Sequence, residues 1–328
     1  MSAATASPLS RNRSVLTLLR TAPMVLLLLV FFVVLAIVEP SFMQVGNLRN
    51  VLTTASILAI PGIGMTLLIA SGAFDLSVGS TLALTGVVTA SLIPTQGLLF
   101  GVTIGLVVAA LVGTTNGLIV TKLRISPLIA TLAMLTIVRG AALVYTDGRD
   151  QLVTEPAFKF FSAYRISGIP VPILLMLAIL LFAAHLLHRT SFGRHLLAVG
   201  SNADAARISG LRVDRIRIAV FAFVGFTAGL WGLIVASQLQ KGSATLGVGS
   251  ELDVIAVAVI GGTPLSGGKA ALTGTFLGAV LITVLRNGLN LLNVGAAYQQ
   301  IAIGTLLVAT IAIHVAIEKR GGDLDAAA

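Results

Sequence analysis

The chain has 328 residues, of which 56% are hydrophobic and only 10% charged, with a formal net charge of +9 and a mean hydropathy of +1.03. A soluble domain carries about 25% charged residues, so this composition excludes a water-soluble fold of this size. The basic residues are scattered between apolar runs, as is common in membrane proteins, so nucleic acid is not an expected partner. Without cysteine, these residues can form no disulfide, thiol nucleophile or thiolate metal site.

The apolar runs predict about ten transmembrane helices, because about 20 apolar residues are enough to cross a bilayer. Cutting the chain at charges, prolines and glycines gives spans at 22–38, 50–70, 77–93, 98–120, 127–145, 170–188, 218–237, 252–262, 270–289 and 298–317. The eighth span is short, and a turn is expected at Pro94-Thr95-Gln96-Gly97. The prediction is an all-α integral membrane protein with one transmembrane domain at 22–318, a polar tail at 1–21 and another at 319–328.

The first apolar run could pass for a signal peptide, because basic residues precede it. However, Glu39-Pro40-Ser41-Phe42 is a poor cleavage site, and more spans follow, so an uncleaved first helix is expected. Ten spans place both termini on one side of the membrane. We assign that side to the cytoplasm because the segments on it hold most of the basic residues. These are Arg11, Arg13, Arg20, Lys122, Arg124, Arg189, Arg194, Arg207, Arg212, Arg215, Arg217, Lys319 and Arg320.

A weak internal repeat relates the two halves of the chain. Asn116-Gly-Leu ends the fourth span and Asn287-Gly-Leu ends the ninth, while Asp75 precedes the third span and Asp253 opens the eighth. An offset of five helices is odd, so the copies would be inverted in the membrane, as in many transporters. The alternative is that a short triplet recurs by chance in a glycine-rich chain.

The polar segment 189–217 is the most informative one. Ser201 or Asn202 can cap a helix that starts at Ala203, and Gly210 suits the left-handed position after its end. The expectation is a short helix outside the membrane, with small residues for a close partner surface and Arg207 among its charges. The alternative is an ordinary basic loop.

Other polar residues support structural roles as readily as functional ones. Asp75 could cap the third span or face a substrate pathway. Arg139 and Arg286 lie in or beside apolar helices and are expected to reach the interface or to pair between helices. Residues 261–270 resemble a phosphate-binding loop, but the required Gly and Ser/Thr are replaced by Thr263 and Ala270, so a tight interhelical turn is expected. No cofactor, metal site or catalytic constellation is expected.

Several of these segments, taken in order, resemble the ribose-type ABC sugar permeases. The similar segments are Gly-Ala-Phe-Asp75-Leu-Ser-Val-Gly-Ser, the Asn116-Gly-Leu stretch, Ala-Val-Gly-Ser-Asn202-Ala-Asp-Ala-Ala-Arg-Ile-Ser-Gly, Glu251-Leu-Asp-Val-Ile-Ala-Val-Ala-Val-Ile-Gly-Gly-Thr and Asn287-Gly-Leu. The resemblance covers roughly residues 40 to 318. One departure is Ala73, where the family usually has glycine.

The resemblance implies the type II-like importer fold, similar to that of the cobalamin permease, and a set of partners. These are a second permease subunit, two ATPase subunits at the cytoplasmic face of a bacterial cell membrane and an extracytoplasmic sugar-binding protein. It also implies that the short polar helix couples to the ATPase, through Asn202, Ala205, Ala206, Arg207, Ser209 and Gly210. Candidate pathway or gating residues are Asp75, Asn116, Asp253 and Asn287.

The expected function is therefore the uptake of a monosaccharide such as ribose or xylose, driven by a separate ATPase. One alternative is an ABC permease for another solute, such as an autoinducer sugar, a nucleoside or a branched-chain amino acid. An ion-coupled secondary transporter is a second alternative. It would need an intramembrane carboxylate, for which only Asp75 and Asp253 are candidates.

Overall fold

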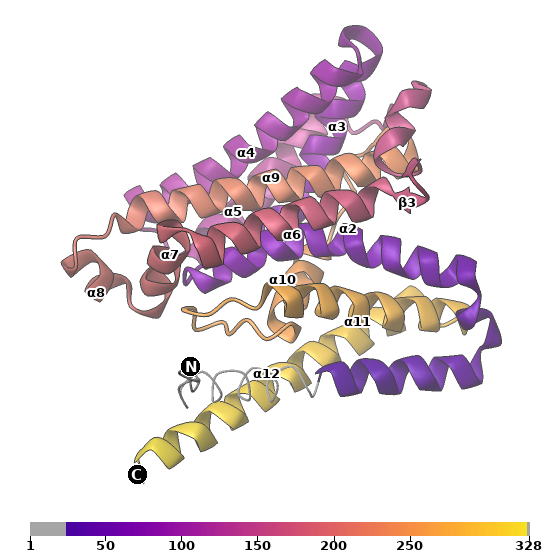
Figure 1. The fold of residues 1–328 in the computed structure, drawn as a ribbon. Coiled ribbons are helices and arrows are strands. Elements are labelled where there is room, and N and C mark those ends of the chain that lie inside the picture. Colours follow the sequence, from indigo (N-terminus) through magenta and orange to yellow (C-terminus); the bar gives the residue numbers. More distant parts are fainter. Residues whose placement is uncertain (1–23, 327–328) are drawn as a thin grey trace, which may run out of the picture.

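The computed structural model describes residues 24–326, so the expected tail at 1–21 and residues 327–328 lie outside the described residues. The described part is almost entirely helical (Figure 1). The long helices are Met24–Val38, α2 (Val45–Ala70), α3 (Val78–Gln96), α4 (Leu98–Lys122), α5 (Pro127–Thr146), α6 (Val171–Arg189), α9 (Val213–Leu239), α11 (Leu272–Leu291) and α12 (Ala296–Ala326). The shorter elements are η1 (Pro40–Met43), β1 (Gln151–Leu152), η2 (Pro156–Phe161), β2 (Arg165–Ile166), β3 (Ile169–Pro170), α7 (Ser191–Ser201), α8 (Ala203–Ile208), β4 (Lys241–Gly242) and α10 (Ser250–Ile260).

A helix lies at each of the ten expected spans. Among the described residues, seven helices are long and apolar enough to cross a membrane. They are α2, α3, α4, α5, α6, α9 and α11. The described part of the first span, Met24–Val38, is shorter, and α10 has only 11 residues. A helix of that length covers about 16 Å, roughly half of a bilayer's hydrocarbon core, so α10 does not cross by itself.

Several predicted boundaries are wrong for physical reasons. Both α2 and α9 start five residues before the predicted spans, because these spans are cut at charged residues that lie inside the helices, Arg49 in α2 and those at 214–217 in α9. The turn expected at residues 94–97 is present but is confined to Gly97, which has a φ of +87°, because α3 continues through Pro94 to Gln96. The α12 helix continues through the charged segment after residue 317 to Ala326.

The segment between α10 and α11 is not the tight turn that we expected. Residues 261–271 form an extended connection, with positive φ values at Gly262, Gly267 and Gly268. The backbone N–H of Gly268 donates to the carbonyl of Ala70 at 2.9 Å, so this connection reaches the end of α2. The connection therefore continues from the end of the short α10 helix toward the end of α2.

Of the seven long apolar helices, α2, α3, α9 and α11 form the core of the bundle, and α4, α5 and α6 cover it. In their most apolar stretches, 83% of the residues of α2 and 67% of those of α9 are buried, against 22% for α4 and 28% for both α5 and α6. The exposed side chains of α4, α5 and α6 are mostly apolar, including Leu111, Ile129 and Leu181. Exposed apolar surface on this scale requires lipid or another apolar partner.

Close helix contact in the core depends on small residues. A Cβ atom added to Gly113 of α4 would lie 2.2 Å from the carbonyl oxygen of Phe221 in α9, and one added to Gly225 would lie 2.3 Å from that of Ala109. Such small residues let helix backbones approach closely, which is how membrane helices gain packing energy.

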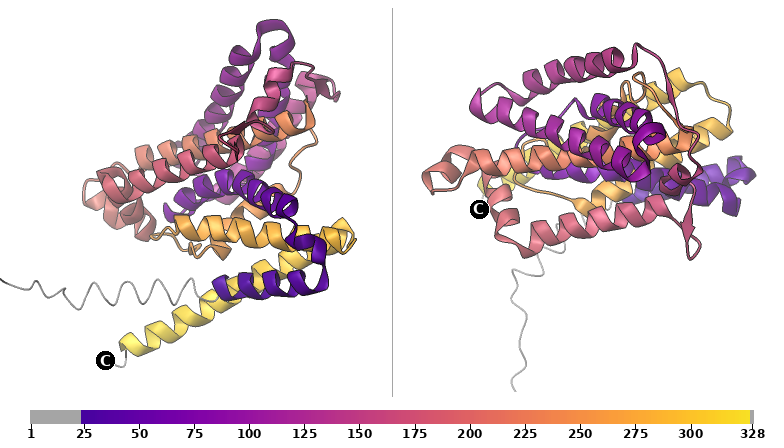
Figure 2. Two further views of the ribbon diagram at one scale, coloured as in Figure 1. Left: turned by 45° about the vertical axis from the view of Figure 1, so that its right-hand side comes forward. Right: turned by 90° about the horizontal axis from the view of Figure 1, so that it is seen from above.

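Several helix contacts recur with the five-span offset that the sequence predicts. Shifting each span by five positions turns the α4–α9 contact into α11–α2, α3–α4 into α10–α11, and α3–α5 into α10–α12, and all of these pairs are in contact. Figures 1 and 2 show α2 and α9 between the α3–α4 pair on one side and the α10–α11 pair on the other.

The bundle has two distinct ends. The α7–α8 end also holds the loop 71–77 and the α4–α5 connection, and the strand end holds η2 and all four short strands (Figure 1). At the strand end, β1 pairs antiparallel with β4, with Gln151 opposite Gly242, and β2 forms a hairpin with β3. The Lys241 ammonium also donates to the Asp150 carboxylate at 2.6 Å. These contacts tie the α5–α6 connection to the end of α9.

Candidate coupling helix and buried polar clusters

The α8 helix is capped at both ends by its own residues. The side chain of Asn202 accepts hydrogen bonds from the backbone N–H groups of Asp204 and Ala205, at 3.1 and 2.9 Å. At the other end, Gly210 has a φ of +82° and donates to Arg207, while Leu211 donates to Ala206. This pair of bonds is the Schellman motif. The predicted short helix with Asn202 before it and Gly210 after it is confirmed.

The exposed face of α8 differs from the set of residues predicted for coupling. Ala205, Arg207, Ser209 and Gly210 are exposed, but Ala206 is buried and therefore helps to hold α8 in place. The sequence-based set missed Ile208, whose side chain is 89% exposed. An apolar residue next to charged ones at a membrane protein's polar end could have indicated this surface. Asn202 is exposed as well and acts as the cap.

The α7 helix packs against α2, α6 and α9, and so connects α8 to the transmembrane core. Thr190 caps α7 by accepting the N–H of Gly193 at 3.3 Å. Near the other end of α7, a Cβ atom on Gly200 would lie 1.8 Å from the carbonyl oxygen of Ala70 and 2.7 Å from the amide of Gly268. No side chain fits there. The end of α2, the α10–α11 connection and α7 therefore meet at Gly200.

A buried carboxylate organises the start of α3. Asp75 is 1% exposed, and one of its oxygens accepts the backbone N–H and the hydroxyl of Ser77, both at 2.7 Å. Its other oxygen accepts the side-chain amide of Asn116 at 2.8 Å. Burial raises the pKa of the Asp75 carboxyl, while these hydrogen bonds act in the opposite direction. The N-cap residue of α3 is Ser77, whose side chain makes no cap hydrogen bond, so the prediction that Asp75 itself caps this helix is wrong.

Replacing Asn116 with alanine is expected to destabilise the protein by about 1–3 kcal/mol, because one oxygen of the buried Asp75 loses its donor. The thermal midpoint of the purified protein in detergent measures the effect. Thr115 is exposed on the same helix, so Thr115→Ala is a matched control expected to change the midpoint little. Equal midpoints for the two variants would show that the Asp75–Asn116 bond contributes nothing.

The other two predicted polar residues lie in a second cluster. Asp253 of α10 is 7% exposed and accepts from the Arg286 guanidinium of α11 at 2.7 Å. The neighbouring Asn287 exchanges hydrogen bonds with Asn47 of α2, at 2.9 and 2.8 Å. Of the two roles expected for Arg286, reaching the membrane interface or pairing between helices, the structure shows the interhelical pair. The structure therefore brings Asp75 together with Asn116 in one cluster. Asp253 and Asn287 belong to the other cluster, where Asp253 bonds Arg286 and not Asn287.

Arg139 serves the connection that precedes α10. Its guanidinium donates to the carbonyl oxygens of Ala244 and Leu246, at 2.6 Å to the first. Carbonyl groups in an irregular segment at membrane depth need such donors, because lipid offers none. The guanidinium of Arg139 is therefore hydrogen-bonded to backbone carbonyl groups of residues 243–249 and holds this segment against α5.

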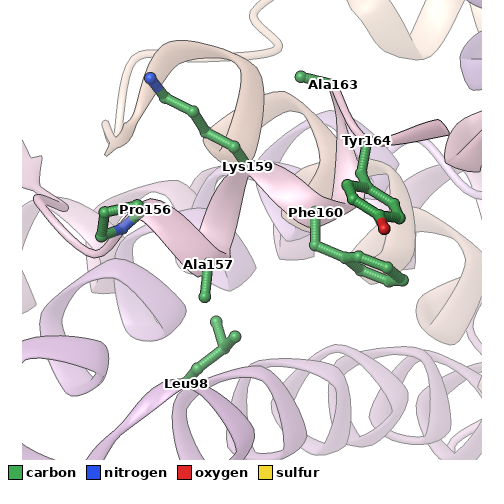
Figure 3. Close-up of a pocket in the computed structure, with 7 residues that line it drawn as sticks. All are labelled: Leu98, Pro156, Ala157, Lys159, Phe160, Ala163 and Tyr164. Carbon is green, nitrogen blue, oxygen red and sulfur yellow. The ribbon is translucent and has the colours of Figure 1, made fainter.

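A shallow apolar groove of about 540 Å³ lies at the strand end, between the start of α4 and η2. Figure 3 shows Phe160 and Tyr164 side by side on its rim, with Leu98 facing Ala157 across the groove. The two aromatic rings lie 5.4 Å apart and are partly exposed, at 41% and 57%. Exposed aromatic side chains are typical of membrane–water interfaces and of protein contacts.

Comparison with known proteins places the chain in a transporter family. The ribose import permease protein RbsC of Escherichia coli (strain K12) is 40% identical over 291 residues, covering 87% of this chain and 91% of that protein. RbsC of Bacillus subtilis (strain 168) is 38% identical, covering 87% and 89%. The L-arabinose ABC transporter permease protein AraH of Azospirillum brasilense is 33% identical, covering 93% and 90%. No solved structure gives a significant match.

The family model described as "Branched-chain amino acid transport system / permease component" matches residues 47–311, which extend from the first turn of α2 into α12 and include both polar clusters. The relatives and this match cover the same transmembrane bundle that the structure shows. Together with its apolar helices, they identify the chain as a multi-pass protein of the cell membrane. The chain belongs to the branched-chain amino acid transport system / permease component family.

Proposed function

We propose that this chain is the membrane-spanning permease subunit of an ABC importer that carries a monosaccharide into the cell. The observation that carries the proposal is its similarity, over about nine tenths of its length, to permeases named for ribose and arabinose. The family description names branched-chain amino acids, but the relatives reported above are named for pentoses. We therefore favour a ribose- or xylose-like sugar over an amino acid, a nucleoside or an autoinducer sugar.

The energy for transport comes, in this proposal, from a separate ATPase subunit that binds the exposed face of α8. Residues 261–270 lack the Gly and Ser/Thr of a phosphate-binding loop, so this chain is not expected to hydrolyse ATP. A sugar-binding protein would deliver the substrate at the strand end. The apolar outer surfaces of α4, α5 and α6 leave room for lipid and for a second permease subunit.

We assign the α7–α8 end to the cytoplasm. Basic residues gather there, in keeping with the positive-inside rule. Among the described residues they include Lys122, Arg124, Arg189, Arg194, Arg207, Arg212, Arg215, Arg217 and Lys269. The strand end, which would face outward, has an acidic partner for Lys241 in Asp150 and fewer basic residues.

The proposed coupling path runs from α8 through α7 into the core. When the ATPase subunits close, they would push α8, whose caps at Asn202 and Gly210 keep it a rigid unit. The contact at Gly200 would pass the displacement to the end of α2 and to the α10–α11 connection. Alternating access requires two arrangements separated by a few kcal/mol, so that nucleotide can shift their populations.

Replacing Ile208 with aspartate tests the proposed ATPase contact. The variant adds a charge to an exposed apolar side chain without changing a buried contact, so membrane insertion and the thermal midpoint are expected to stay unchanged. Co-purification of the ATPase subunit is expected to fall at least tenfold. Leu152 is 70% exposed at the opposite end, and Leu152→Asp is expected to leave co-purification intact. Wild-type recovery of the ATPase with the Ile208 variant would exclude α8 as the coupling surface.

The ion-coupled alternative has little support in the two buried carboxylates. Asp75 is bound by Ser77 and Asn116, and Asp253 is paired with Arg286. A coupling-ion site usually gathers several oxygen ligands around an open position. Among the described residues, no group of three or more acidic, His or Cys side chains could hold a metal ion. The two carboxylates are better explained as structural groups at the starts of α3 and α10.

A further inference from the structure

A basic pocket lies at the α7–α8 end, beside the proposed coupling helix. Its volume is about 670 Å³, and it opens between the end of α4, the α4–α5 connection, α8 and the start of α9. Four cationic side chains and one carboxylate line it, which leaves three positive charges in excess. These residues are Lys122, Arg124, Arg207, Arg217 and Asp214.

The single carboxylate does not satisfy the four cations. Asp214 accepts from Lys122 at 2.7 Å and lies 3.8 Å from Arg207, which also lies 3.5 Å from Asp204 outside the pocket lining. Arg217 donates weakly to the carbonyl of Ser71 at 3.4 Å, and its buried Nε has no hydrogen-bond partner. Arg124 makes no hydrogen bond or ion pair with any described residue and has a φ of +55°, which is strained for a side chain of this size. The guanidinium of Arg124 and the Nε of Arg217 therefore have no hydrogen-bond partner among the described residues.

The start of α5 adds backbone donors to the same pocket. Ser126 and Pro127 line it, and the Ser126 side chain does not cap the helix. The first amide groups of this 20-residue helix therefore lack a partner from the N-cap side chain, and a helix start favours an anion. Guanidinium groups together with free amides are the donor set that binds phosphate.

The surroundings of the pocket select a lipid over a soluble anion. Immediately beyond the pocket, the α4–α5 connection and the first turns of α5 expose Leu123, Leu128, Ile129 and Leu132, at 67%, 48%, 63% and 52%. An amphiphile would fill both parts of this surface, with its phosphate among the cations and its acyl chains along α5. Basic pockets beside membrane helices are suited to anionic headgroups.

We propose that this pocket binds the headgroup phosphate of an anionic phospholipid whose acyl chains lie along the exposed face of α5. The phosphate would bridge Arg124 on the α4–α5 connection and Arg217 on α9, and it would also lie near Arg207 of α8. A bound lipid would thus fasten the coupling helix to the ends of α4 and α5. This inference concerns lipid binding alone and does not depend on which solute the protein carries.

Native mass spectrometry of the purified full chain tests the proposal, with dioctanoyl phosphatidylglycerol as the probe. Dioctanoyl phosphatidylcholine and inorganic phosphate are the comparison ligands. The wild type is expected to bind phosphatidylglycerol at least tenfold more tightly than phosphatidylcholine. Arg124→Gln alone is expected to reduce that preference severalfold, and Arg124→Gln/Arg217→Gln is expected to abolish it. Arg189 and Arg194 are exposed at the same end but outside the pocket, so Arg189→Gln/Arg194→Gln should keep the preference.

Because Arg217 is partly buried, the thermal midpoint without lipid shows whether the double variant is folded, and Arg124→Gln tests the site at an exposed position. Equal affinity of the wild type for the two lipids would overturn the proposal. So would an equal loss in the pocket variants and the Arg189/Arg194 control, which would indicate a general effect of charge. Displacement of phosphatidylglycerol by millimolar inorganic phosphate would show that the pocket is a site for soluble anions and not for lipid.

Discussion

Replacing Gly200 with alanine is expected to lower substrate uptake at least tenfold while leaving the amount of protein in the membrane unchanged. The new methyl group would lie 1.8 Å from the carbonyl oxygen of Ala70 and 2.7 Å from the amide of Gly268. Real Cβ atoms do not approach other heavy atoms more closely than about 3 Å, so α7 must move away from α2. In the proposed coupling path, that movement separates α8 from the transmembrane core.

A second glycine provides the control for this experiment. Gly140 is also inside a helix, and an added Cβ atom there meets no atom within 4 Å. Gly140→Ala is therefore expected to keep uptake within about twofold of the wild type, since alanine also favours the helix. ATPase co-purification distinguishes coupling from binding, because the exposed face of α8 is unchanged in Gly200→Ala. Wild-type uptake by Gly200→Ala would exclude the α7–α2 contact as part of the coupling path.

The second large effect is expected at the ion pair between Asp253 and Arg286. Removing one member of a buried ion pair typically costs about 3–5 kcal/mol, because the remaining charge has no partner. Asp253 is 7% exposed, while the side chain of Arg286 is 38% exposed. Arg286→Ala, which leaves the buried carboxylate alone, should therefore lower stability by about 3 kcal/mol. Asp253→Asn should cost less, because the more exposed arginine can turn toward water.

A double variant separates the charge effect from loss of packing. In Asp253→Asn/Arg286→Gln both charges are gone and a hydrogen bond remains possible, so much of the stability lost in Arg286→Ala should return. Thermal midpoints of the four proteins in one detergent give the comparison. If the double variant is no more stable than Arg286→Ala, the unpaired charge of Asp253 is not the source of the effect.

Hydropathy was sufficient to place the ten helices but not to set their ends. Charges at residues 214–217 lie in the first turns of α9 and Arg49 lies in α2, because a helix can extend beyond the apolar core of the bilayer. The sequence predicts a turn at Pro94, but this residue lies in the last turn of α3, three residues before the turn at Gly97. The pairing of β1 with β4 joins Gln151 to Gly242, and nothing local in either segment predicts it.

The site was predictable to the extent that it is local. Asn202 and Gly210 mark the two ends of α8 by side-chain and backbone chemistry alone, and the structure confirms both. Which face of α8 is buried depends on α7 and α9, so Ala206 was assigned to the wrong side. The bond from Asn116 to Asp75 crosses 41 positions of the sequence and became visible only when the helices were assembled. The inverted repeat indicated that both residues mattered, but not that they touch.

The most direct test of the account is ATP-driven accumulation of labelled ribose in sealed vesicles that contain this chain. Vesicles with the chain alone should accumulate no ribose with or without ATP. Vesicles that also contain the partner ATPase, with the sugar-binding protein on the opposite side, should accumulate it only with ATP, and unlabelled arabinose should compete more strongly than leucine. ATP-independent accumulation by the chain alone would contradict the account, and ATP-driven uptake of leucine but not ribose would contradict the proposed substrate.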